Sequence, residues 1–199
     1  MKSNKRPLIL IHGLWNNSNI FKHLIAKLQE QNIEYFAPTL SHKYGKTSIV
    51  KLAIDLNQII IEKYGLEQEI DILGFSMGGI IGNYWISKLD GYKRTIRFIS
   101  VGSPHNGTLT AQLVPGFLFK GISEMKLNSF LLRELSKDSL FLKDIQCISL
   151  FTIWDLMVLP GWKAHLPKGM KISLNVMKHR NLVKQANAIN KIIQVLIKT

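Results

Sequence analysis

The sequence lacks several features that characterise particular classes of protein. Its 199 residues include one cysteine, Cys147, so the chain can form neither an internal disulfide nor a cysteine-rich zinc site. No apolar run reaches the roughly 18 residues that a transmembrane helix needs, and we expect no such helix. Internal repeats, low-complexity tracts and linker-like stretches are also missing. Residues 1–199 are therefore expected to form a single domain with a sizeable core.

The N-terminal segment does not have the pattern of a signal peptide. Residues 1–6 are basic, but the apolar stretch that follows, Leu8–Ile11, is too short for a signal-peptide core, and no small-residue cleavage site comes after it. We therefore expect a cytoplasmic location. In that compartment the N-x-Ser/Thr matches at Asn16 and Asn106 carry no glycan.

Acidic residues are few, at 13 against 26 lysines and arginines, which gives a net charge of +13. The basic residues are dispersed along the chain, and a surface of this kind is attracted to anionic membranes and to nucleic acid. No helix-turn-helix or RNP signature is present, so we expect no nucleic-acid partner. A weak association with anionic membranes and an ordinary solvated basic surface both stay open, and the sequence does not indicate an oligomeric state.

Short apolar runs alternate with amphipathic helical patterns along most of the chain. This alternation predicts an α/β fold in which a mostly parallel sheet is covered by helices on both faces. In the second helix, Ser48 is the expected N-cap and Gly65 the expected stop. The expected strands are 8–11, 33–37, 70–75, 95–101, 147–153 and 170–176, and the expected helices are 19–31, 47–64, 77–89 and 181–197.

The segment 108–143 interrupts this alternation. It contains no clear strand and has short amphipathic pieces instead, such as residues 124–135. In an open α/β sheet, an excursion between strands at the carboxyl edge commonly covers the functional site. The segment is therefore predicted to be a short helical, cap-like insertion, and an ordinary pair of crossover helices is the alternative.

The most informative motif is Gly74-Phe75-Ser76-Met77-Gly78, which follows an apolar strand and precedes a helical pattern. This arrangement predicts a nucleophile elbow, in which a serine at a sharp strand-to-helix turn projects its hydroxyl from the sheet edge. Gly74 and Gly78 fit this turn because it leaves no room for Cβ atoms at those positions. The alternative is a glycine-rich turn with a surface serine.

A nucleophilic serine needs a base, and the base needs an acid that orients it. On this architecture both follow later strands, in the order serine, acid, histidine. His179 follows the last expected strand, whereas His165 comes before it and is the weaker candidate. Asp155 closes the preceding strand, while other nearby acidic residues lie at that strand's opposite end. The predicted catalytic residues are thus Ser76, Asp155 and His179.

Two backbone N–H groups are expected to bind the oxyanion. One belongs to Met77, directly after the serine, and the other to Leu14, in the loop after the first strand. Gly13 permits the turn in that loop, and His12 is expected to orient the loop through hydrogen bonds. The residues expected around the substrate are His12, Gly13, His105, Leu109 and Leu113, with apolar residues of 109–135 as the acyl-binding wall.

These motifs together resemble the α/β-hydrolase superfamily, and within it small bacterial lipases and related esterases. The resemblance extends from residue 8 to residue 197. It implies a triad of Ser76, Asp155 and His179, with the N–H groups of Leu14 and Met77 as oxyanion donors. The segments that carry it are 8–14, 74–78, 102–108 with its Ser-Pro-His-x-Gly pattern, 155–158, and His179 followed by a helix.

The predicted function is that of a serine carboxyl-ester hydrolase, a lipase or esterase that acts on a small-molecule ester or lipid. An acyltransferase or thioesterase would use the same residues, and a non-catalytic binding module is a further alternative. Gly45-Lys46-Thr47 suggests a P-loop, but Leu40 stands where that motif needs glycine. The chain has neither a G-x-G-x-x-G nor a His-Glu-x-x-His motif, so no cofactor and no metal ion are expected.

Overall fold

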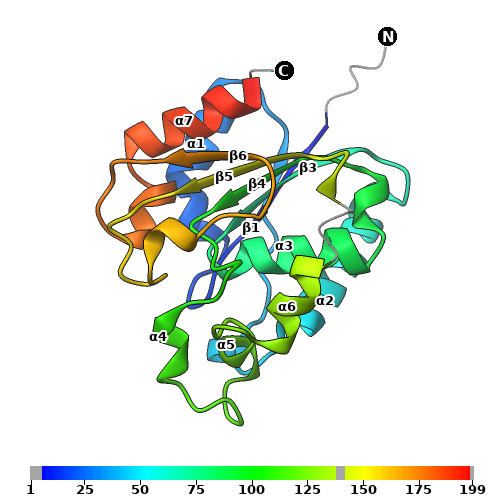
Figure 1. Cartoon of the computed structure of the whole chain (residues 1–199). Helices are drawn as coiled ribbons and strands as arrows, with labels where there is room; N and C mark the ends of the chain where they lie inside the picture. The colour runs from blue at the N-terminus through cyan, green and yellow to red at the C-terminus, as the bar shows by residue number, and fades with distance from the viewer. Residues whose placement is uncertain (1–5, 138–141, 198–199) are drawn as a thin grey trace.

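The protein is built on a twisted, entirely parallel β-sheet, shown in Figure 1. The structure is a computed structural model that describes residues 6–137 and 142–197. Within these residues the sheet has six strands, as the alternation of apolar runs predicts. In spatial order they are β2 (Tyr35–Phe36), β1 (Leu8–Ile11), β3 (Ile70–Phe75), β4 (Thr95–Val101), β5 (Gln146–Phe151) and β6 (Met170–Ser173).

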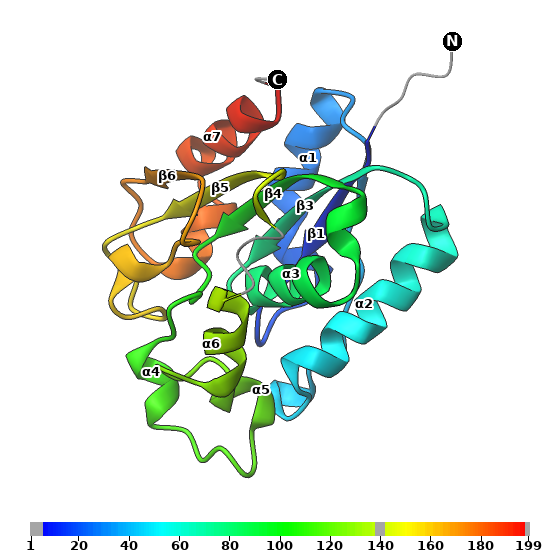
Figure 2. The ribbon, with the colours of Figure 1, turned by 45° about the vertical axis from the view of Figure 1, so that its right-hand side comes forward.

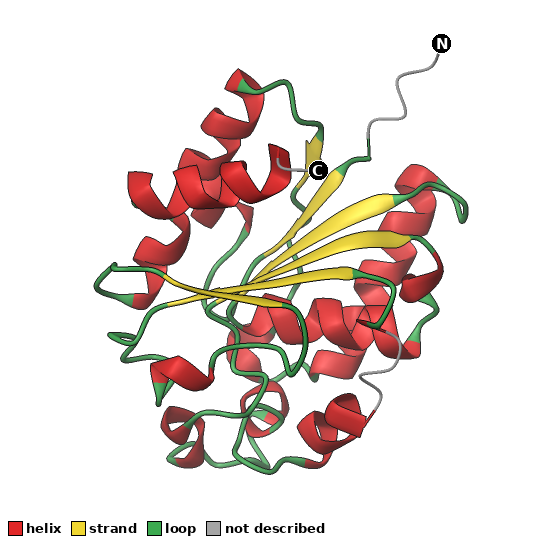
Figure 3. Cartoon of the chain, turned by 45° about the horizontal axis from the view of Figure 1, so that its top comes forward, coloured by secondary structure: helices red, strands yellow, loops and turns green. Residues whose placement is uncertain are grey.

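Helices cover both faces of this sheet, so the molecule has three layers (Figures 2 and 3). One outer layer contains α1 (Lys22–Glu30) and α7 (Ala186–Ile197), which contact each other. The other contains α2 (Ile49–Tyr64) and α3 (Met77–Lys88), which also pack side by side. No helix in the described ranges is both long enough and apolar enough to cross a membrane.

Strand side chains alternate between the two cores that these layers enclose. Leu8 and Leu10 of β1 pack into the core with α1 and α7, whereas Ile9 and Ile11 pack into the core with α2 and α3. Successive residues of a strand point to opposite faces, so a continuous apolar run serves both cores. Cys147 of β5 is buried in the second of these cores, and burial raises the pKa of its thiol to about 12.

The central elements match their predicted ranges, whereas the peripheral ones are shorter. α2 begins after Ser48, whose hydroxyl accepts a hydrogen bond from Lys51 N at 3.1 Å, and ends at Gly65, which has a positive φ of 72°. β2 keeps two of its five predicted residues. β5 and β6 also end early, because Thr152 leaves the sheet to donate its hydroxyl to the Val176 carbonyl at 2.7 Å.

Two predicted helices start with a 3₁₀ turn. Ser18–Phe21 forms η1 before α1, and His179–Val183 forms η6 before α7. The sequence predicted one continuous helix in each place. The short 3₁₀ turns give the chain a tighter entry into each helix.

The segment after β4 is helical, as predicted for a cap. Between residues 108 and 137 it forms α4 (Leu109–Gln112), α5 (Lys120–Ser123) and α6 (Phe130–Lys137), and it contains no strand there. Figure 2 shows these helices together at one end of the molecule, beside α3 and the start of α2. Residues 138–141 of the predicted insertion lie outside the described residues.

The strand order creates a natural crevice at the carboxyl edge of the sheet. The chain passes from β1 outward to β2 and then returns to β3 on the other side of β1. The connections therefore diverge between β1 and β3, and ligands of open α/β sheets bind at such switch points. The loops after β1, β3, β5 and β6, which carry the predicted site residues, all leave the sheet at this edge.

Candidate active site

Ser76 lies at the turn between β3 and α3 with φ 57° and ψ −127°. A positive φ is strained for a residue with a side chain and is concentrated at functional sites. Neighbouring backbone holds the turn, since Ser76 N donates to Val101 O at 2.9 Å and Gly79 N donates to Ser76 O at 3.0 Å. A Cβ on Gly78 would lie 2.1 Å from Ile11 O, so glycine alone fits there. The backbone thus has the strand–turn–helix geometry that the sequence predicts.

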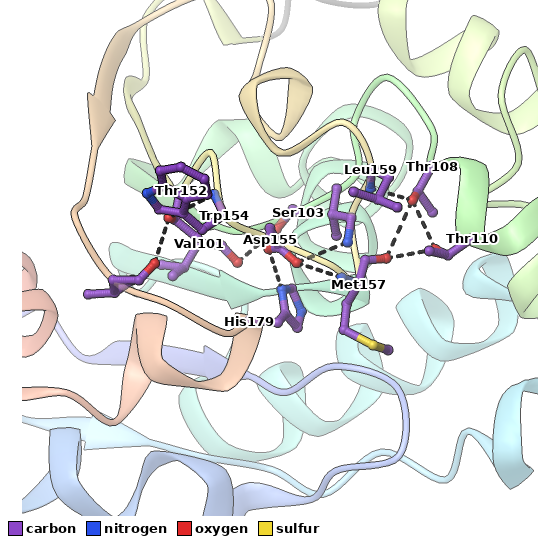
Figure 4. A network of polar contacts seen from close by, with 12 residues as sticks. Val101, Ser103, Thr108, Thr110, Thr152, Trp154, Asp155, Met157, Leu159 and His179 are labelled. Carbon is purple, nitrogen blue, oxygen red and sulfur yellow. Dashed lines mark hydrogen bonds and ion pairs between the residues drawn. The ribbon is translucent and has the colours of Figure 1, made fainter.

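Asp155 and His179 meet at the same edge, although 24 residues separate them. His179 Nδ1–H donates to Asp155 Oδ2 at 2.6 Å (Figure 4). The other carboxylate oxygen, Oδ1, accepts from Met157 N at 2.8 Å and from Val158 N at 3.0 Å. Asp155 is 1% exposed. These three donors hold the carboxylate in one orientation and compensate its removal from water.

The ring of His179 is fixed by packing as well as by Asp155. It lies 4.7 Å from the Phe75 ring, centroid to centroid, at an interplanar angle of 31°. Its second nitrogen, Nε2, is buried and has no hydrogen-bond partner among residues 6–137 and 142–197. With Nδ1 protonated, Nε2 is the acceptor of the neutral imidazole. His179 therefore has a carboxylate on one ring nitrogen and an acceptor without a described partner on the other.

Ser76 and His179 line one cavity of about 600 Å³, a volume within the range of about 300–1,000 Å³ that small-molecule sites have. Its wall is mainly apolar on the side of the cap and of the loop after β5. Its charged side chains come from residues 178–184, which include His179. The apolar wall comprises Leu14, Ala111, Val114, Ile122, Met125, Met157 and Val158, and the rest of the lining includes Trp15, Asn16, Thr108, Thr110, Lys178, Arg180, Asn181 and Lys184.

The loop after β1 lies directly against the serine. A Cβ on Gly13 would lie 2.7 Å from Ser76 Cβ and 3.2 Å from its Oγ, so the close approach requires glycine. Leu14 lines the cavity, and Met77 begins α3 immediately after Ser76. The two residues predicted as oxyanion donors are therefore on the two segments that flank the serine.

His12 is fully buried behind this loop and does not line the cavity. Its Nε2 accepts from Leu40 N at 2.9 Å, and its Nδ1 donates to Gly13 O at 3.0 Å. Burial lowers the pKa of His12, and the nearby His42 adds a smaller effect in the same direction. His12 therefore positions Gly13 from behind, and the structure does not place it in contact with the cavity as a substrate-binding residue.

The other four residues expected around the substrate also lie outside the cavity lining, although Gly13 packs against Ser76. His105 is buried against Ser100, whose Oγ lies 2.7 Å from His105 Nε2, and burial lowers the pKa of His105 to about 3. Leu109 and Leu113 are 51% and 88% exposed. Ala111 in α4 and Val114, two residues after that helix ends, line the cavity in their place.

Sequence reasoning missed the link between the cap and the loop that carries Asp155. Thr110 Oγ1 donates to Met157 O at 2.7 Å, and Thr108 Oγ1 accepts from Leu159 N at 2.8 Å, as Figure 4 shows. Leu109 N also donates to Leu159 O at 3.0 Å. No sequence pattern signals these contacts, because they join segments about 50 residues apart whose proximity depends on the tertiary fold.

The site contains no arrangement suited to a metal ion. In the part of the chain that the structure describes, no three His, Cys, Asp or Glu side chains are grouped as metal ligands would be. The groups available for chemistry are a hydroxyl, an imidazole, a carboxylate and backbone N–H groups. Such a set is suited to nucleophilic acyl transfer.

The sequence profile of palmitoyl protein thioesterases matches residues 7–147. The chain belongs to the palmitoyl protein thioesterase family. The matched range includes Ser76 and the whole cap segment 108–143, and it ends before Asp155 and His179. A comparison with curated proteins gives no match.

Solved structures show the same fold across almost the whole chain. The mature lipase BlEst2 of Bacillus licheniformis superposes with a TM-score of 0.73 at 14% identity, over 98% of this chain and 93% of that one. The lin2722 product of Listeria innocua gives 0.75 at 13% identity, over 98% and 95%. The α/β-hydrolase MGS-MChE2, from a metagenome of lagoon sediments at Mar Chica in Morocco, gives 0.72 at 19% identity, over 97% and 90%.

These likenesses confirm the α/β-hydrolase fold that the motifs predicted. The family match and the fold together show that this protein is a hydrolase of the lipase, esterase and thioesterase group. At such low sequence identities the structural neighbours show only the fold, so the substrate has to be inferred from the site itself.

Proposed function

We propose that the protein hydrolyses acyl esters or acyl thioesters through a covalent acyl-enzyme on Ser76. The observation that carries this proposal is the state of His179. Its Nδ1 is held by Asp155 at 2.6 Å, its Nε2 has no partner among the described residues, and its ring lines the same cavity as Ser76. His42 and His105 also have a ring nitrogen without a partner among the described residues, but neither is paired with a carboxylate and neither lines this cavity.

The reaction follows from this arrangement. The Ser76 hydroxyl attacks the acyl carbonyl while His179 Nε2 takes its proton, and Asp155 stabilises the imidazolium that forms. The N–H groups of Leu14 and Met77 bind the oxyanion of the tetrahedral intermediate. The imidazolium then protonates the leaving oxygen or sulfur, and a water molecule releases the acid by the same steps in reverse order.

The apolar wall supports an acyl chain as the part of the substrate that enters the cavity. Burial of apolar surface contributes about 25 cal/mol per Å², so each methylene placed along this wall strengthens binding. The family match favours thioesters, while the predicted lipase or esterase activity on oxygen esters uses the same residues. An acyltransferase would differ in replacing water by an alcohol or thiol acceptor.

The first test is hydrolysis of p-nitrophenyl esters and of matched S-acyl N-acetylcysteamine thioesters, from acetyl to palmitoyl. We expect Ser76→Ala to lose about 10³-fold or more in kcat/KM on every substrate that the wild type cleaves. Ser173→Ala, which changes an exposed serine on β6, is the control and should keep full activity. Folded wild-type protein with no activity above that of Ser76→Ala on any member would refute the proposal.

A further inference from the structure

A second cavity opens beside the candidate active site. It has a volume of about 660 Å³ and lies between the loop after β1, the loop at residues 39–44 and the turn η6. Trp15, Asn16, Arg180 and Lys184 line both this cavity and the one that contains Ser76. The two cavities are therefore neighbours that share a wall. We call the second one the basic groove.

The charge of the basic groove is uniformly positive. Lys43, Arg180 and Lys184 line it, and Lys178 lines the adjacent rim of the active-site cavity. No aspartate or glutamate occurs among the described residues that line either cavity. Asp155, which lies nearby, is buried and already accepts three hydrogen bonds.

Four lysines elsewhere in the described chain are neutralised by neighbouring carboxylates, unlike these cations. Lys27, Lys51, Lys93 and Lys137 each form an ion pair with a carboxylate on a neighbouring helical or turn position. None of the four cations around the groove forms an ion pair with a described residue. Like charges gathered in one concave surface repel each other and focus a positive potential there. Such a surface gains most from an anionic ligand.

The position of the groove relative to the reacting atoms indicates which part of a substrate it would hold. The cap supplies an apolar wall through Ala111, Val114 and Met125, where an acyl chain fits. Arg180 follows the proposed base directly in the sequence and belongs to both cavities. When the acyl chain lies against the cap, the leaving group extends along η6 into the basic groove.

We propose that the basic groove binds a phosphate group carried by the leaving alcohol or thiol of the substrate. This inference rests on the proposed acyl hydrolase function. The guanidinium of Arg180 can bind two phosphate oxygens at once, and Lys43 and Lys184 supply point charges. The substrate class is an acyl ester of a phosphorylated alcohol, such as a phospholipid head group, or an acyl thioester of a phosphate-bearing thiol, such as a coenzyme A thioester.

The chemistry at the acyl group is unchanged by this choice. The bond from Ser76 Oγ to the acyl carbon forms as the carbon–oxygen or carbon–sulfur bond breaks. The serine proton passes through His179 Nε2 to the leaving oxygen or sulfur, which departs with its phosphate. Water then hydrolyses the acyl-serine and restores both groups, so the groove contributes binding and orientation only.

The test uses substrate pairs that differ in the phosphate. Octanoylglycerol is compared with octanoylglycerol 3-phosphate, and octanoyl-N-acetylcysteamine with octanoyl-coenzyme A, all below their micellar concentrations. We expect kcat/KM for the phosphate-bearing member of at least one pair to exceed that of its partner by about tenfold or more, since hydrogen bonds to charged groups have this effect. The pair that responds identifies the source of the phosphate.

Two double variants separate the groove from general charge. Arg180→Ala with Lys184→Ala should reduce the ratio of kcat/KM between phosphate-bearing and phosphate-free members by about tenfold or more. Arg133→Ala with Lys171→Ala removes the same two charges from exposed positions that line neither cavity, and should keep the wild-type ratio. Inhibition of octanoyl p-nitrophenyl ester hydrolysis by glycerol 3-phosphate, compared with glycerol, gives a second measure of phosphate binding.

The outcomes distinguish the two proposals. If wild type cleaves both members of each pair equally, and glycerol 3-phosphate inhibits no better than glycerol, the basic groove does not bind phosphate while the hydrolase proposal stands. If both double variants lower the ratio alike, the preference arises from net charge and the groove inference is wrong. If no substrate is cleaved by the wild type, the hydrolase proposal itself fails.

Discussion

At the scale of single residues, three buried histidines differ in what their ring nitrogens contact. His12 has both nitrogens paired with backbone groups of the loop after β1 and of Leu40. His179 has one nitrogen on Asp155 and the other without a partner in the described chain. His105 contacts the Ser100 hydroxyl and packs edge-on to Phe98, with centroids 6.3 Å apart. His105 Nδ1 also has no described partner, so what distinguishes His179 is its Asp155 contact and its place in the cavity lining.

The buried position of His105 predicts a loss of stability in acid. Burial, with a smaller effect of His165, lowers its folded-state pKa to about 3 from the ordinary 6.5. Between these values the unfolded chain binds a proton that the folded chain excludes, so stability falls as pH falls from 6.5 towards 3. The slope is about 1.4 kcal/mol per pH unit. Urea unfolding of the wild type should therefore show a drop of about 2 kcal/mol from this residue between pH 7 and pH 5.

The variant His105→Gln keeps a hydrogen-bonding side chain and removes the titrating group. We expect it to show a smaller drop between pH 7 and pH 5 than the wild type, by about 2 kcal/mol. His23→Gln, on an exposed position of α1, serves as the control and should keep the wild-type slope. Equal drops in His105→Gln and the wild type would show that His105 does not cause the acid sensitivity.

The residues of the candidate site differ in how well the sequence locates them. Ser76, Asp155 and His179 follow named strands, so their order along the chain is enough to predict one common edge. Their catalytic roles stay predictions. Leu109 and Leu113 were chosen as apolar residues of the cap, but a four-residue helix has too few turns for periodicity to show its inner face. The structure turns Ala111 and Val114 inward instead.

At the scale of elements, prediction succeeded where both faces of a strand are buried. β3 and β4 have neighbours on both sides and helices above and below, so their apolar runs coincide with their hydrogen-bonded lengths. β2 and β6 are the edge strands of the described sheet, and each is shorter than its apolar run. An edge strand has only one neighbouring strand, so its length depends on where the hydrogen bonds to that neighbour end. The local sequence does not indicate that position.

The cap is joined to the core at α5 through a buried carboxylate. Glu124 Oε2 accepts a hydrogen bond from Ile49 N at 2.6 Å, in the first turn of α2. A Cβ on Gly121 would lie 2.4 Å from Thr47 O, so α5 also packs tightly against the segment before α2. These contacts fix the end of the cap that supplies Ile122 and Met125 to the cavity wall.

Removal of this carboxylate should destabilise both elements. Glu124→Ala leaves Ile49 N–H without its acceptor, and we expect the free energy of unfolding to fall by about 1–2 kcal/mol, as for loss of a helix N-cap. Hydrogen exchange should accelerate at Ile49 and across residues 120–125. Glu124→Gln retains an acceptor oxygen and should recover most of the stability. Glu134→Ala, on the partly exposed side of α6, is the control, because it removes another carboxylate of the cap. If it lowers the free energy of unfolding as much as Glu124→Ala does, the hydrogen bond between Glu124 and Ile49 does not hold the cap to the core.

At the scale of the whole molecule, large apolar side chains are exposed to solvent on two segments that border the candidate active site. Leu113 and Phe117 are each 88% exposed in the segment between α4 and α5, and Trp154 and Leu156 are 56% and 75% exposed in the loop after β5. Both segments border the cavity, through Val114 and Met157 respectively. Exposed apolar side chains gathered around a pocket indicate a surface that contacts another apolar phase.

Together with the net charge of +13, this surface supports a proposal that the protein associates with anionic membranes, the partner that the composition left open. In this proposal, anionic lipids would attract the basic surface and the apolar side chains would then enter the interface. We expect binding to phosphatidylcholine vesicles that contain phosphatidylglycerol to exceed binding to phosphatidylcholine alone. The difference should shrink as salt screens the charges. Co-sedimentation over a series of salt concentrations measures both effects.

Substitution in the exposed apolar segment separates insertion from general attraction. Leu113→Ser with Phe117→Ser keeps the net charge but removes two large apolar groups, and it should weaken vesicle binding by about tenfold or more. Leu66→Ser is the control, because Leu66 is 67% exposed in the loop before β3, at the amino end of that strand and opposite the cavity. It should bind as the wild type does. If Leu66→Ser weakens binding as much as the double variant does, the apolar residues around the cavity are not the membrane contact. If the protein binds anionic vesicles no better than neutral ones at low salt, charge does not guide the association.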